Sequence, residues 1–567
     1  MMKKNVFLLG LSILLASCSF DISIGGNSSS FISTNSSNVT SLVTTPNTSS
    51  SEISTPSISS TTTSTTTPFP STTLSPSTTS VVPTTPVTVD RTISLYGIND
   101  FHGAIVPNLA NYEQGIIKIG SFFKKKGQES NTLLINAGDM WQGSIESNYN
   151  RGKLLTDCMN YIEFDAFTIG NHEFDWGAEY IRENRKRKDE STNYQTPFLA
   201  ANIYNYDISK KQVLDYADFG DKYTIRTLEN GLRVGIIGVI GSDQITSITS
   251  TFADDFTFIE PVNVIKTLSD ELRTEHNVDV VIASVHSDQD DFLNTGITSV
   301  SNVSNKRYVD AVFCAHTHQN EKSIENGVPF VQASYNGRSY SNIELIISPS
   351  GEVTSKSYSY IYTSNINIDT DTKLNSMVQK YLDETKDVGD EVIAKSDGTL
   401  SSDDTLMNLV TTAMYESSKS LGYDVSYAIT NGGRSDLPNG TITYSNLFKS
   451  LPFDNEIYIL EVNGNTLKKV LNYSWIGMYR ADKAAISTSK TYRIAVIDYL
   501  AVHRNINREY NYFTTFTYVN KLTMENVEMY NYRDITANYL RSLETINTSN
   551  FSSSLNQFNK SKLSSNI

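Results

Sequence analysis

Between residues 90 and 320 the chain repeats one pattern, a short apolar run that ends in polar residues. Ile93 to Ile98 alternates in the way that is typical of a strand. Segments with helical character, such as 115–126 and 261–275, lie between the runs. Alternating strands and helices predict an α/β domain whose site follows the carboxyl ends of its strands. The predicted strands are 93–98, 132–135, 164–169, 232–240, 278–285 and 308–313.

Side chains that can bind metals follow five of these runs. Five of the seven histidines fall at strand ends, whereas His276 and His503 do not and are interpreted as structural. Each motif alone is a weak signal, and Asp139 by itself fits a turn equally well. Carboxylate, imidazole and amide groups together suit Zn or divalent first-row metals. The motifs are Asn99-Asp100-Phe101-His102-Gly103, Gly138-Asp139, Gly170-Asn171-His172-Glu173-Phe174-Asp175, His286 and Ala315-His316-Thr317-His318.

A second region begins after an amphipathic segment. Residues 371–384 predict a helix capped by Asp369 or Asp371, because apolar residues recur there at helical spacing. We therefore expect a catalytic domain over 90–363 and a connector helix within 364–390. A β-rich, Tyr-rich domain is expected over 391–547, and a polar tail that frays over 548–567.

The N-terminus has the pattern of a targeting signal. Lys3 and Lys4 precede an apolar run that ends in Leu15-Ala16-Ser17-Cys18, which predicts a signal peptide over 1–18. Cys18 in this setting resembles the bacterial lipobox and would be lipidated, by palmitate among other chains; the alternative is an ordinary secretory peptide. Residues 19–89 are rich in Ser, Thr and Pro and predict a disordered tether. We expect the protein at the extracellular face of a bacterial cell membrane.

Net charge and cysteine content exclude some classes of partner and of fold. The 567 residues carry a net charge of −15, which argues against a nucleic-acid polymer as partner. A phosphate site would need local positive charge from metal ions or Arg. Three cysteines cannot form a disulfide framework, and Cys158 and Cys314 are expected to be buried thiols. Oligomeric state is not indicated by the sequence.

The ordered motifs resemble the calcineurin-like metallophosphoesterases, and more narrowly the 5′-nucleotidase family. Asn-Asp-Phe-His-Gly and Gly-Asn-His-Glu-Phe-Asp-Trp-Gly carry that likeness, and Ala315 departs from the usual Gly. The resemblance implies an α/β fold, with a four-layer catalytic sandwich followed by a smaller α/β substrate-binding domain with a mixed sheet.

The resemblance also implies a site with two divalent metal ions, Zn, Mn or similar. One metal would bind Asp100, His102, Asp139 and His318, and the other would bind Asp139, Asn171, His286 and His316. Such a pair activates water and holds a phosphoryl group in line. His172 would act as a catalytic residue oriented by Asp175, while Glu173 is expected to be structural.

In the second domain the resemblance implies a nucleotide site made by Asn431, Arg434, Phe453 and Tyr499. On its own, Asn431-Gly432-Gly433-Arg434 also fits a hairpin turn. Three departures from the family pattern are a loop one residue shorter before Arg434, no Arg in 401–406, and no Gly-Gly-Asp after Tyr499.

Three functions remain open at this point. The first is release of phosphate from nucleoside 5′-monophosphates. The second is hydrolysis of 2′,3′-cyclic nucleotides or UDP-sugars, which the three departures motivate. The third is a non-catalytic surface-binding lipoprotein.

Overall fold

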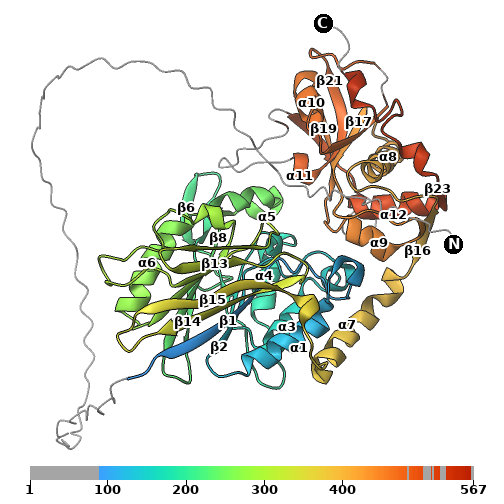
Figure 1. The fold of residues 1–567 in the computed structure, drawn as a ribbon. Coiled ribbons are helices and arrows are strands. Elements are labelled where there is room, and N and C mark those ends of the chain that lie inside the picture. The colour runs from blue at the N-terminus through green and yellow to red at the C-terminus, as the bar shows by residue number, and fades with distance from the viewer. Residues whose placement is uncertain (1–87, 482–483, 502–512, 514–515, 524–530, 564–567) are drawn as a thin grey trace, which may run out of the picture. The chain divides into compact units, whose positions relative to one another are not determined.

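The computed structural model describes residues 88–481, 484–501, 513, 516–523 and 531–563 (Figure 1). Cys18 and His503 lie outside these residues, as do the predicted signal peptide and nearly all of the tether. Thr84–Ile567 forms one compact unit. Among the described helices, none is both long enough and apolar enough to cross a lipid bilayer.

Two six-stranded sheets form the first half. In the first sheet, β1 to β4 run parallel and β14 and β15 add antiparallel strands at one edge. In the second, β8, β10, β11 and β13 are parallel, with β7 and β12 antiparallel at the edges. The strand order of the first sheet is β15 (Val353–Tyr362), β14 (Ser339–Ile347), β1 (Arg91–Ile98), β2 (Thr132–Asn136), β3 (Ala166–Thr168), β4 (Phe198–Leu199). The second is β12 (Glu321–Glu325), β13 (Val328–Gln332), β11 (Ala311–Phe313), β10 (Val280–His286), β8 (Arg233–Ile240), β7 (Tyr223–Thr227).

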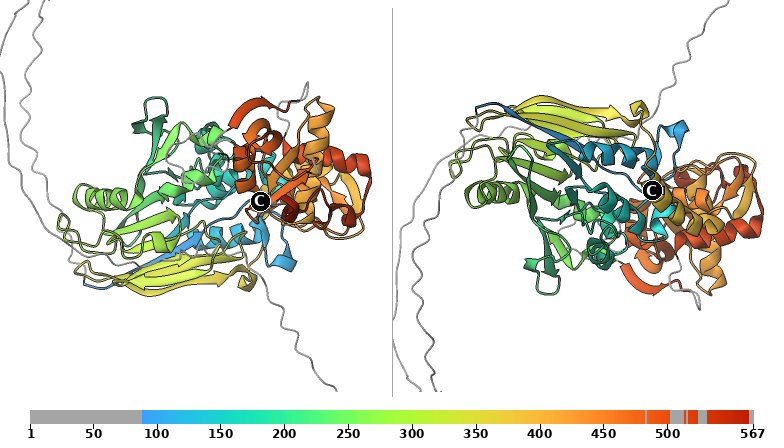
Figure 2. Two further views of the ribbon diagram at one scale, coloured as in Figure 1. Left: turned by 90° about the horizontal axis from the view of Figure 1, so that it is seen from above. Right: turned by 90° about the horizontal axis from the view of Figure 1, so that it is seen from below.

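The two sheets pack face to face and helices cover their outer sides (Figure 2). Leu95 of β1 and Ile282 of β10 belong to the apolar layer between the sheets. Helices α1 (Gly115–Gly127) and α3 (Lys153–Ile162) cover the first sheet, and α6 (Pro261–Thr274) covers the second. Strand β10 is buried along its whole length, as expected for a parallel strand covered on both faces. The predicted four-layer sandwich is therefore confirmed.

Smaller elements complete this half. A three-stranded sheet is formed by β5 (Ile203–Asp207), β6 (Gln212–Tyr216) and β9 (Phe256–Phe258). The short helices are α2 (Ile145–Asn148), α4 (Ala178–Arg185) and α5 (Ser250–Ala253).

The connector is the helix α7 (Thr372–Gly389), as the sequence predicts. The side chain of Asp371 accepts a hydrogen bond from the backbone N–H of Leu374 and caps its first turn. Leu374 and Val378 are fully buried in the core shared with α1 and α3. The helix is therefore anchored to the first half and leads directly into the second.

The second half is a smaller α/β domain with a mixed sheet, as predicted. Strands β17 and β21 are parallel and their other neighbours are antiparallel. The five-stranded sheet has the order β20 (Ile476–Arg480), β17 (Tyr427–Asn431), β21 (Thr491–Ile497), β19 (Ile457–Asn463), β22 (Phe516–Lys521). A smaller sheet holds β18 (Gly440–Thr443), β16 (Val392–Ser396) and β23 (Thr545–Ile546). The helices are α8 (Thr405–Ser420), α9 (Tyr444–Ser450), α10 (Gly464–Leu471), α11 (Asp498–Ala501) and α12 (Tyr532–Leu543).

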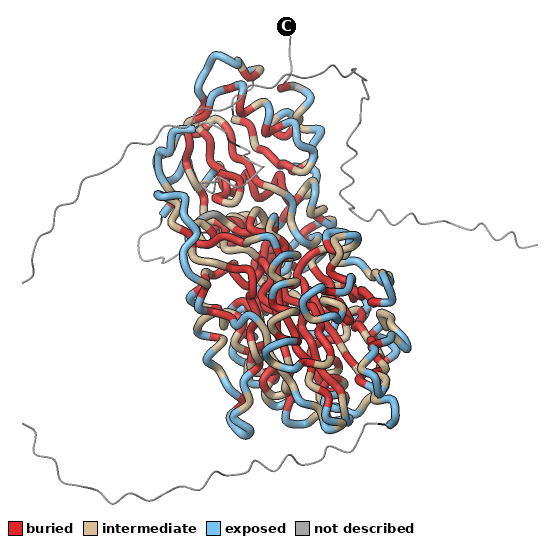
Figure 3. The backbone as a smooth tube through the Cα atoms, turned by 90° about the vertical axis from the view of Figure 1, so that its left-hand side faces the viewer, coloured by how far each residue is buried: buried red, intermediate tan, exposed pale blue. Residues whose placement is uncertain are grey.

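The end of the described chain differs from the expected frayed tail. Phe551, Phe558 and Leu563 are buried in the core of the second half. Figure 3 shows that buried stretches of the backbone, drawn in red, gather in the interior of the described chain. Three large apolar side chains supply the burial that a polar tail would lack, so 548–563 packs as part of the domain. The expectation of fraying is wrong for these residues.

Candidate metal centre

The predicted metal ligands converge at one edge of the two sheets. Each comes from the carboxyl end of a parallel strand, where neighbouring strands deliver their following loops to the same edge. All seven are therefore brought together, although 216 positions of sequence separate His102 from His318. Asp100 and His102 follow β1, Asp139 follows β2, Asn171 follows β3, His286 ends β10, and His316 and His318 follow β11.

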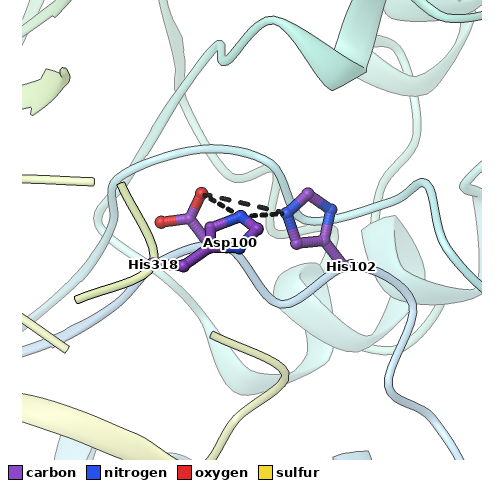
Figure 4. A group of neighbouring side chains, drawn as sticks. All are labelled: Asp100, His102 and His318. Carbon is purple, nitrogen blue, oxygen red and sulfur yellow. Dashed lines mark hydrogen bonds and ion pairs between the residues drawn. The ribbon is translucent and has the colours of Figure 1, made fainter. Parts of the chain in front are cut away.

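Asp100, His102 and His318 form one group of possible ligands (Figure 4). The Nε2 atoms of the two histidines are 2.9 Å apart. Asp100 Oδ1 lies 3.6 Å from His318 Nε2 and 3.9 Å from His102 Nε2. This oxygen is buried and has no hydrogen-bond partner among the described residues. A buried carboxylate oxygen without a donor, facing two imidazole nitrogens, fits a cation.

Asp139, His286 and His316 form a second group, which Asn171 joins. His286 Nε2 is 3.2 Å from Asp139 Oδ2 and 3.1 Å from Asn171 Oδ1. His316 Nδ1 is 3.0 Å from the same amide oxygen. The other nitrogen of His286 lies 2.9 Å from the carbonyl of Ala137 and can donate to it, which directs Nε2 into the site.

The backbone at the site is held in an unusual conformation. Five candidate ligands have positive φ, a region that residues other than glycine seldom adopt. Such strain persists where the surrounding fold enforces it, and it concentrates at functional sites. The five are Asp100 (47°), His102 (48°), Asp139 (54°), His316 (76°) and His318 (61°).

Two glycines permit the close approach of these loops. A Cβ on Gly138 would lie 2.5 Å from His286 Nδ1, and one on Gly170 would lie 2.3 Å from Asp139 Oδ1. Either contact would displace a ligand. Gly138 and Gly170 therefore allow the close approach of the ligand loops.

Burial sets the charge of the cluster. It lowers the pKa of His316 and of His318 to about 3, so both imidazoles are neutral and offer lone pairs. It raises the pKa of Asp100 to about 7, because the carboxylate is removed from water. A cation among these groups would offset the cost of burying that carboxylate. The donor set therefore fits divalent metal ions.

Glu173 fixes the position of the ligand loops. Its carboxylate accepts hydrogen bonds from the backbone N–H groups of Asp139 (2.9 Å), Met140 (2.9 Å) and Gly170 (2.8 Å). The side chain is completely buried. It therefore joins the loop after β2 to the loop after β3, in agreement with its predicted structural role.

His172 stands at the edge of the cluster. Its Nδ1 lies 2.9 Å from Asp175 Oδ2, and its Nε2 lies 3.2 Å from Arg434 Nη2. Because Arg434 can only donate, Nε2 accepts and Nδ1 carries the proton that Asp175 binds. The ring of Phe453 stacks on the imidazole with centroids 5.6 Å apart and planes at 24°. Arg434 and Phe453 thus reach the site from the second half.

The other two residues predicted for the nucleotide lie elsewhere. Asn431 ends β17 opposite Ile476, and Tyr499 lies in α11, partly buried against the core of the second half. Neither is among the described residues that line the cavity next to His102 and His318. The structure therefore brings two of the four together with the metal ligands.

Two further residues at the site have no counterpart in the sequence-based prediction. Asn99 Nδ2 donates to Asp100 Oδ2 over 2.7 Å and fixes that carboxylate. Gln142 is 2% exposed and lines the cavity beside the cluster. Asn99 could have been suspected because it directly precedes Asp100, whereas nothing in the sequence marks Gln142.

Comparisons with known proteins agree with this architecture. Residues 93–320 match the calcineurin-like phosphoesterase family, and residues 385–483 match the 5′-nucleotidase C-terminal domain. The chain is 26% identical to "Endonuclease YhcR" of Bacillus subtilis, over 67% of this chain and 33% of that protein. It is 28% identical to 5′-nucleotidase of Homo sapiens, over 61% of this chain and 63% of that protein. It thus spans less than two thirds of both relatives.

A solved structure shows the same fold. The 5′-nucleotidase precursor from Thermus thermophilus matches with a TM-score of 0.63 at 18% identity, covering 80% of this chain and 97% of that one. The two family matches therefore identify residues 93–320 as a calcineurin-like phosphoesterase domain, of a family that uses a dinuclear metal centre, and residues 385–483 as a 5′-nucleotidase C-terminal domain.

Proposed function

We propose that the chain is a dinuclear-metal phosphohydrolase that releases phosphate from nucleoside 5′-monophosphates. The observation that carries the proposal is the position of Asp139, whose Oδ2 lies 3.2 Å from His286 Nε2 of one ligand group and 4.0 Å from His102 Nε2 of the other. Asp139 also forms a possible ligand group with His102 and His172, and His172 contacts Arg434. The site thus combines metal ligands with an imidazole that can carry a proton, His172, and a guanidinium that can bind phosphate, Arg434.

The ligand sets follow the two groups of side chains. Asp100, His102, Asp139 and His318 would hold one metal, and Asp139, Asn171, His286 and His316 would hold the other. When bound, two such cations supply Lewis-acid chemistry at the phosphoryl oxygens and lower the pKa of water. They also supply the positive charge that a chain of net charge −15 needs in order to attract a phosphate.

His172 and Asp175 handle the proton. Asp175 holds the proton on Nδ1 of His172, so Nε2 is the atom left to act on the substrate. A proton taken up at Nε2 can be given to the leaving oxygen of the ester. Arg434, adjacent to that atom, can place its planar guanidinium on the phosphate oxygens.

The nucleoside is assigned to the second half. The match of residues 385–483 to the 5′-nucleotidase C-terminal domain supports this assignment. Phe453 and Tyr499 offer ring faces for a base, where stacking contributes about 1–3 kcal/mol per base. Asn431 and Arg434 would add hydrogen bonds to the nucleotide.

A substrate panel tests the proposal. Metal-reconstituted protein and the Asp139→Asn variant are given AMP, UDP-glucose and 2′,3′-cyclic AMP, with single-stranded RNA as a polymer control. Product formation is followed for each substrate: phosphate from AMP, UMP from UDP-glucose, and the nucleoside monophosphate from 2′,3′-cyclic AMP. We expect turnover to be fastest with AMP, absent from the variant, and absent with RNA. If AMP is the poorest substrate, the function is that of a cyclic-nucleotide or UDP-sugar hydrolase.

The non-catalytic alternative has its own test. Its motivation is the long Ser/Thr-rich tether, which suits display of a binding protein. Purified protein that takes up no metal and releases no phosphate from any member of the panel would establish it. The complete set of candidate ligands around Asp139 argues against it.

We also propose that Cys18 is lipidated and anchors the protein at the extracellular face of the cell membrane. Leu-Ala-Ser before Cys18, after a charged and an apolar segment, supports this. Expression in a bacterium with an alkyne-labelled palmitate should label the native chain and leave Cys18→Ser unlabelled. Equal labelling of the two would contradict it.

A further inference from the structure

The loop 451–454, which carries Phe453, is held by a buried arginine of its own half. Arg533, at the start of α12, is 4% exposed. Its Nη1 donates to the carbonyl oxygens of Leu451 (3.1 Å) and Phe453 (3.0 Å), and its Nη2 binds Asp454 Oδ1. A planar guanidinium holds several acceptors in a fixed arrangement. The backbone around Phe453 is therefore set within the second half.

The first half binds the same loop on either side of Phe453. Asn148 Nδ2 donates to the carbonyl of Pro452 over 3.0 Å, and Arg151 Nη1 donates to Asp454 Oδ2 over 2.9 Å. Asn148 is 5% exposed, whereas the side chain of Arg151 is partly exposed. Because water screens a buried hydrogen bond less, the contact of Asn148 should be the stronger of the two.

Asn148 also holds the loop that packs on His102. Its Oδ1 accepts from the backbone N–H of Gly143 over 2.9 Å. The carbonyl of the preceding residue, Gln142, lies 3.2 Å from His102 Nδ1 and can accept its proton, which directs Nε2 toward the other candidate ligands. The Nε2 of Gln142 has no hydrogen-bond partner among the described residues, so it does not anchor this loop.

The fit between this loop and His102 leaves no spare room. A Cβ on Gly143 would overlap the carbonyl oxygen of His102. The N–H of Gly143 can only donate and the carbonyl of Pro452 can only accept, so the two partners fix the orientation of the Asn148 amide. One buried side chain thus joins the loop beside a candidate metal ligand to the loop of Phe453.

We propose that Asn148 is a positioning residue for nucleotide hydrolysis, which sets Phe453, and with it the base, at a fixed place relative to the metal centre. This role rests on the proposed function, because Phe453 can act on a base only if the substrate is a nucleotide. The two ends of the amide have separate tasks. Oδ1 keeps the backbone of Gly143 in place, and Nδ2 holds Pro452.

Asn148→Asp separates these two tasks. The carboxylate keeps an acceptor for Gly143 but has no donor for Pro452, and above neutral pH its charge faces that carbonyl. On the metal-reconstituted full chain, we expect KM for AMP to rise about tenfold with kcat little changed. Asn148→Ala removes both contacts without burying a charge, and its KM should rise at least as much.

Asn160→Asp is the matched control. Asn160 is a buried residue of α3 whose Oδ1 accepts from the backbone N–H of Thr196 over 2.9 Å. Its Nδ2 has no hydrogen-bond partner within the described ranges. The substitution therefore keeps an acceptor and removes a donor that binds nothing there, so KM for AMP should stay at the native value.

A double-mutant cycle shows whether Asn148 acts through Phe453. In the Phe453→Ala background, Asn148→Asp should leave KM for AMP unchanged, because the ring that Asn148 positions is gone. An equal rise in KM in both backgrounds overturns the role, as does a KM in both Asn148 variants that equals that of Asn160→Asp. A fall in kcat at constant KM also overturns it, because only the His102 side would then be affected. Each of these results leaves the proposed function intact, whereas native protein that does not cleave AMP overturns both.

Discussion

The cluster of candidate metal ligands and the loops of the second half that carry Arg434 and Phe453 are built in different ways. The cluster is held by backbone: five ligands at positive φ, glycines where loops touch, and Glu173 binding three N–H groups of two loops. Arg434 and Phe453 instead meet His172 through side chains alone. The first region is therefore preorganised for chemistry, and the second depends on how the two halves pack. Damage to the first should appear in kcat and metal content, and damage to the second in KM.

The largest effect is expected from Asp139→Asn. The substitution removes the negative charge of the carboxylate that lies between the two ligand groups, with little change in shape. Loss of a residue that only orients a metal ligand lowers metal affinity or activity about 10–100-fold. Loss of Asp139, a candidate ligand itself, should therefore lower kcat by on the order of 10³-fold or more. Phosphate release from AMP measures it. Asp218→Asn, at an exposed site, is the control, and a variant within tenfold of native activity would refute the shared role.

Glu173→Gln should come next. An amide cannot accept from all the N–H groups that the carboxylate binds, and its own NH₂ would face donors. Metal affinity should fall about 10–100-fold, measured by titration of the metal-free protein. Stability should fall by about 1–3 kcal/mol in urea. If the variant keeps native metal affinity and only its stability falls, Glu173 contributes to folding and not to metal binding.

Phe453→Ala addresses the second region. Loss of a stacking face should raise KM for AMP about 5–150-fold, the equivalent of about 1–3 kcal/mol. The maximal rate should change less, because the ligands stay in place. Phe516→Ala, a partly exposed ring on β22, serves as control. A fall in kcat at constant KM would show that Phe453 acts on His172 and not on the base.

The smallest effect is expected from Arg151→Ala. Arg151 Nη1 binds Asp454 Oδ2 at 2.9 Å and so links the two halves next to Phe453. The side chain is partly exposed, so the pair is worth about 0–1 kcal/mol and KM should rise up to about fivefold. Arg182→Ala, which breaks a surface pair with Asp218, is the control. If Arg151→Ala and Arg182→Ala change KM equally, the Arg151–Asp454 ion pair has no role in placing Phe453.

The difference between the regions also explains what the sequence could predict. Asp100, Asp139 and His286 follow apolar strands, and parallel strands deliver their ends to one edge, so their convergence was predictable. Gln142 carries no such signal, because its importance depends on burial and on an unmet hydrogen bond. The position of Asn431 and Tyr499 likewise depends on how the second half packs. The burial of Phe551 and Phe558 was missed because the few apolar residues there, with Leu555 between them, stand in an otherwise polar stretch whose composition predicts fraying.

Metal content measured together with activity tests the central claim most directly. Native protein is stripped with a chelator, reloaded with Zn²⁺ or Mn²⁺ and freed of excess ion, and metal per chain and phosphate release from AMP are recorded on the same samples. The account predicts that activity rises with loading and is complete at two ions per chain, and that Asp139→Asn reaches neither. Full activity in the stripped protein, or a loaded protein with two ions per chain and no activity on any phosphate ester, would contradict it.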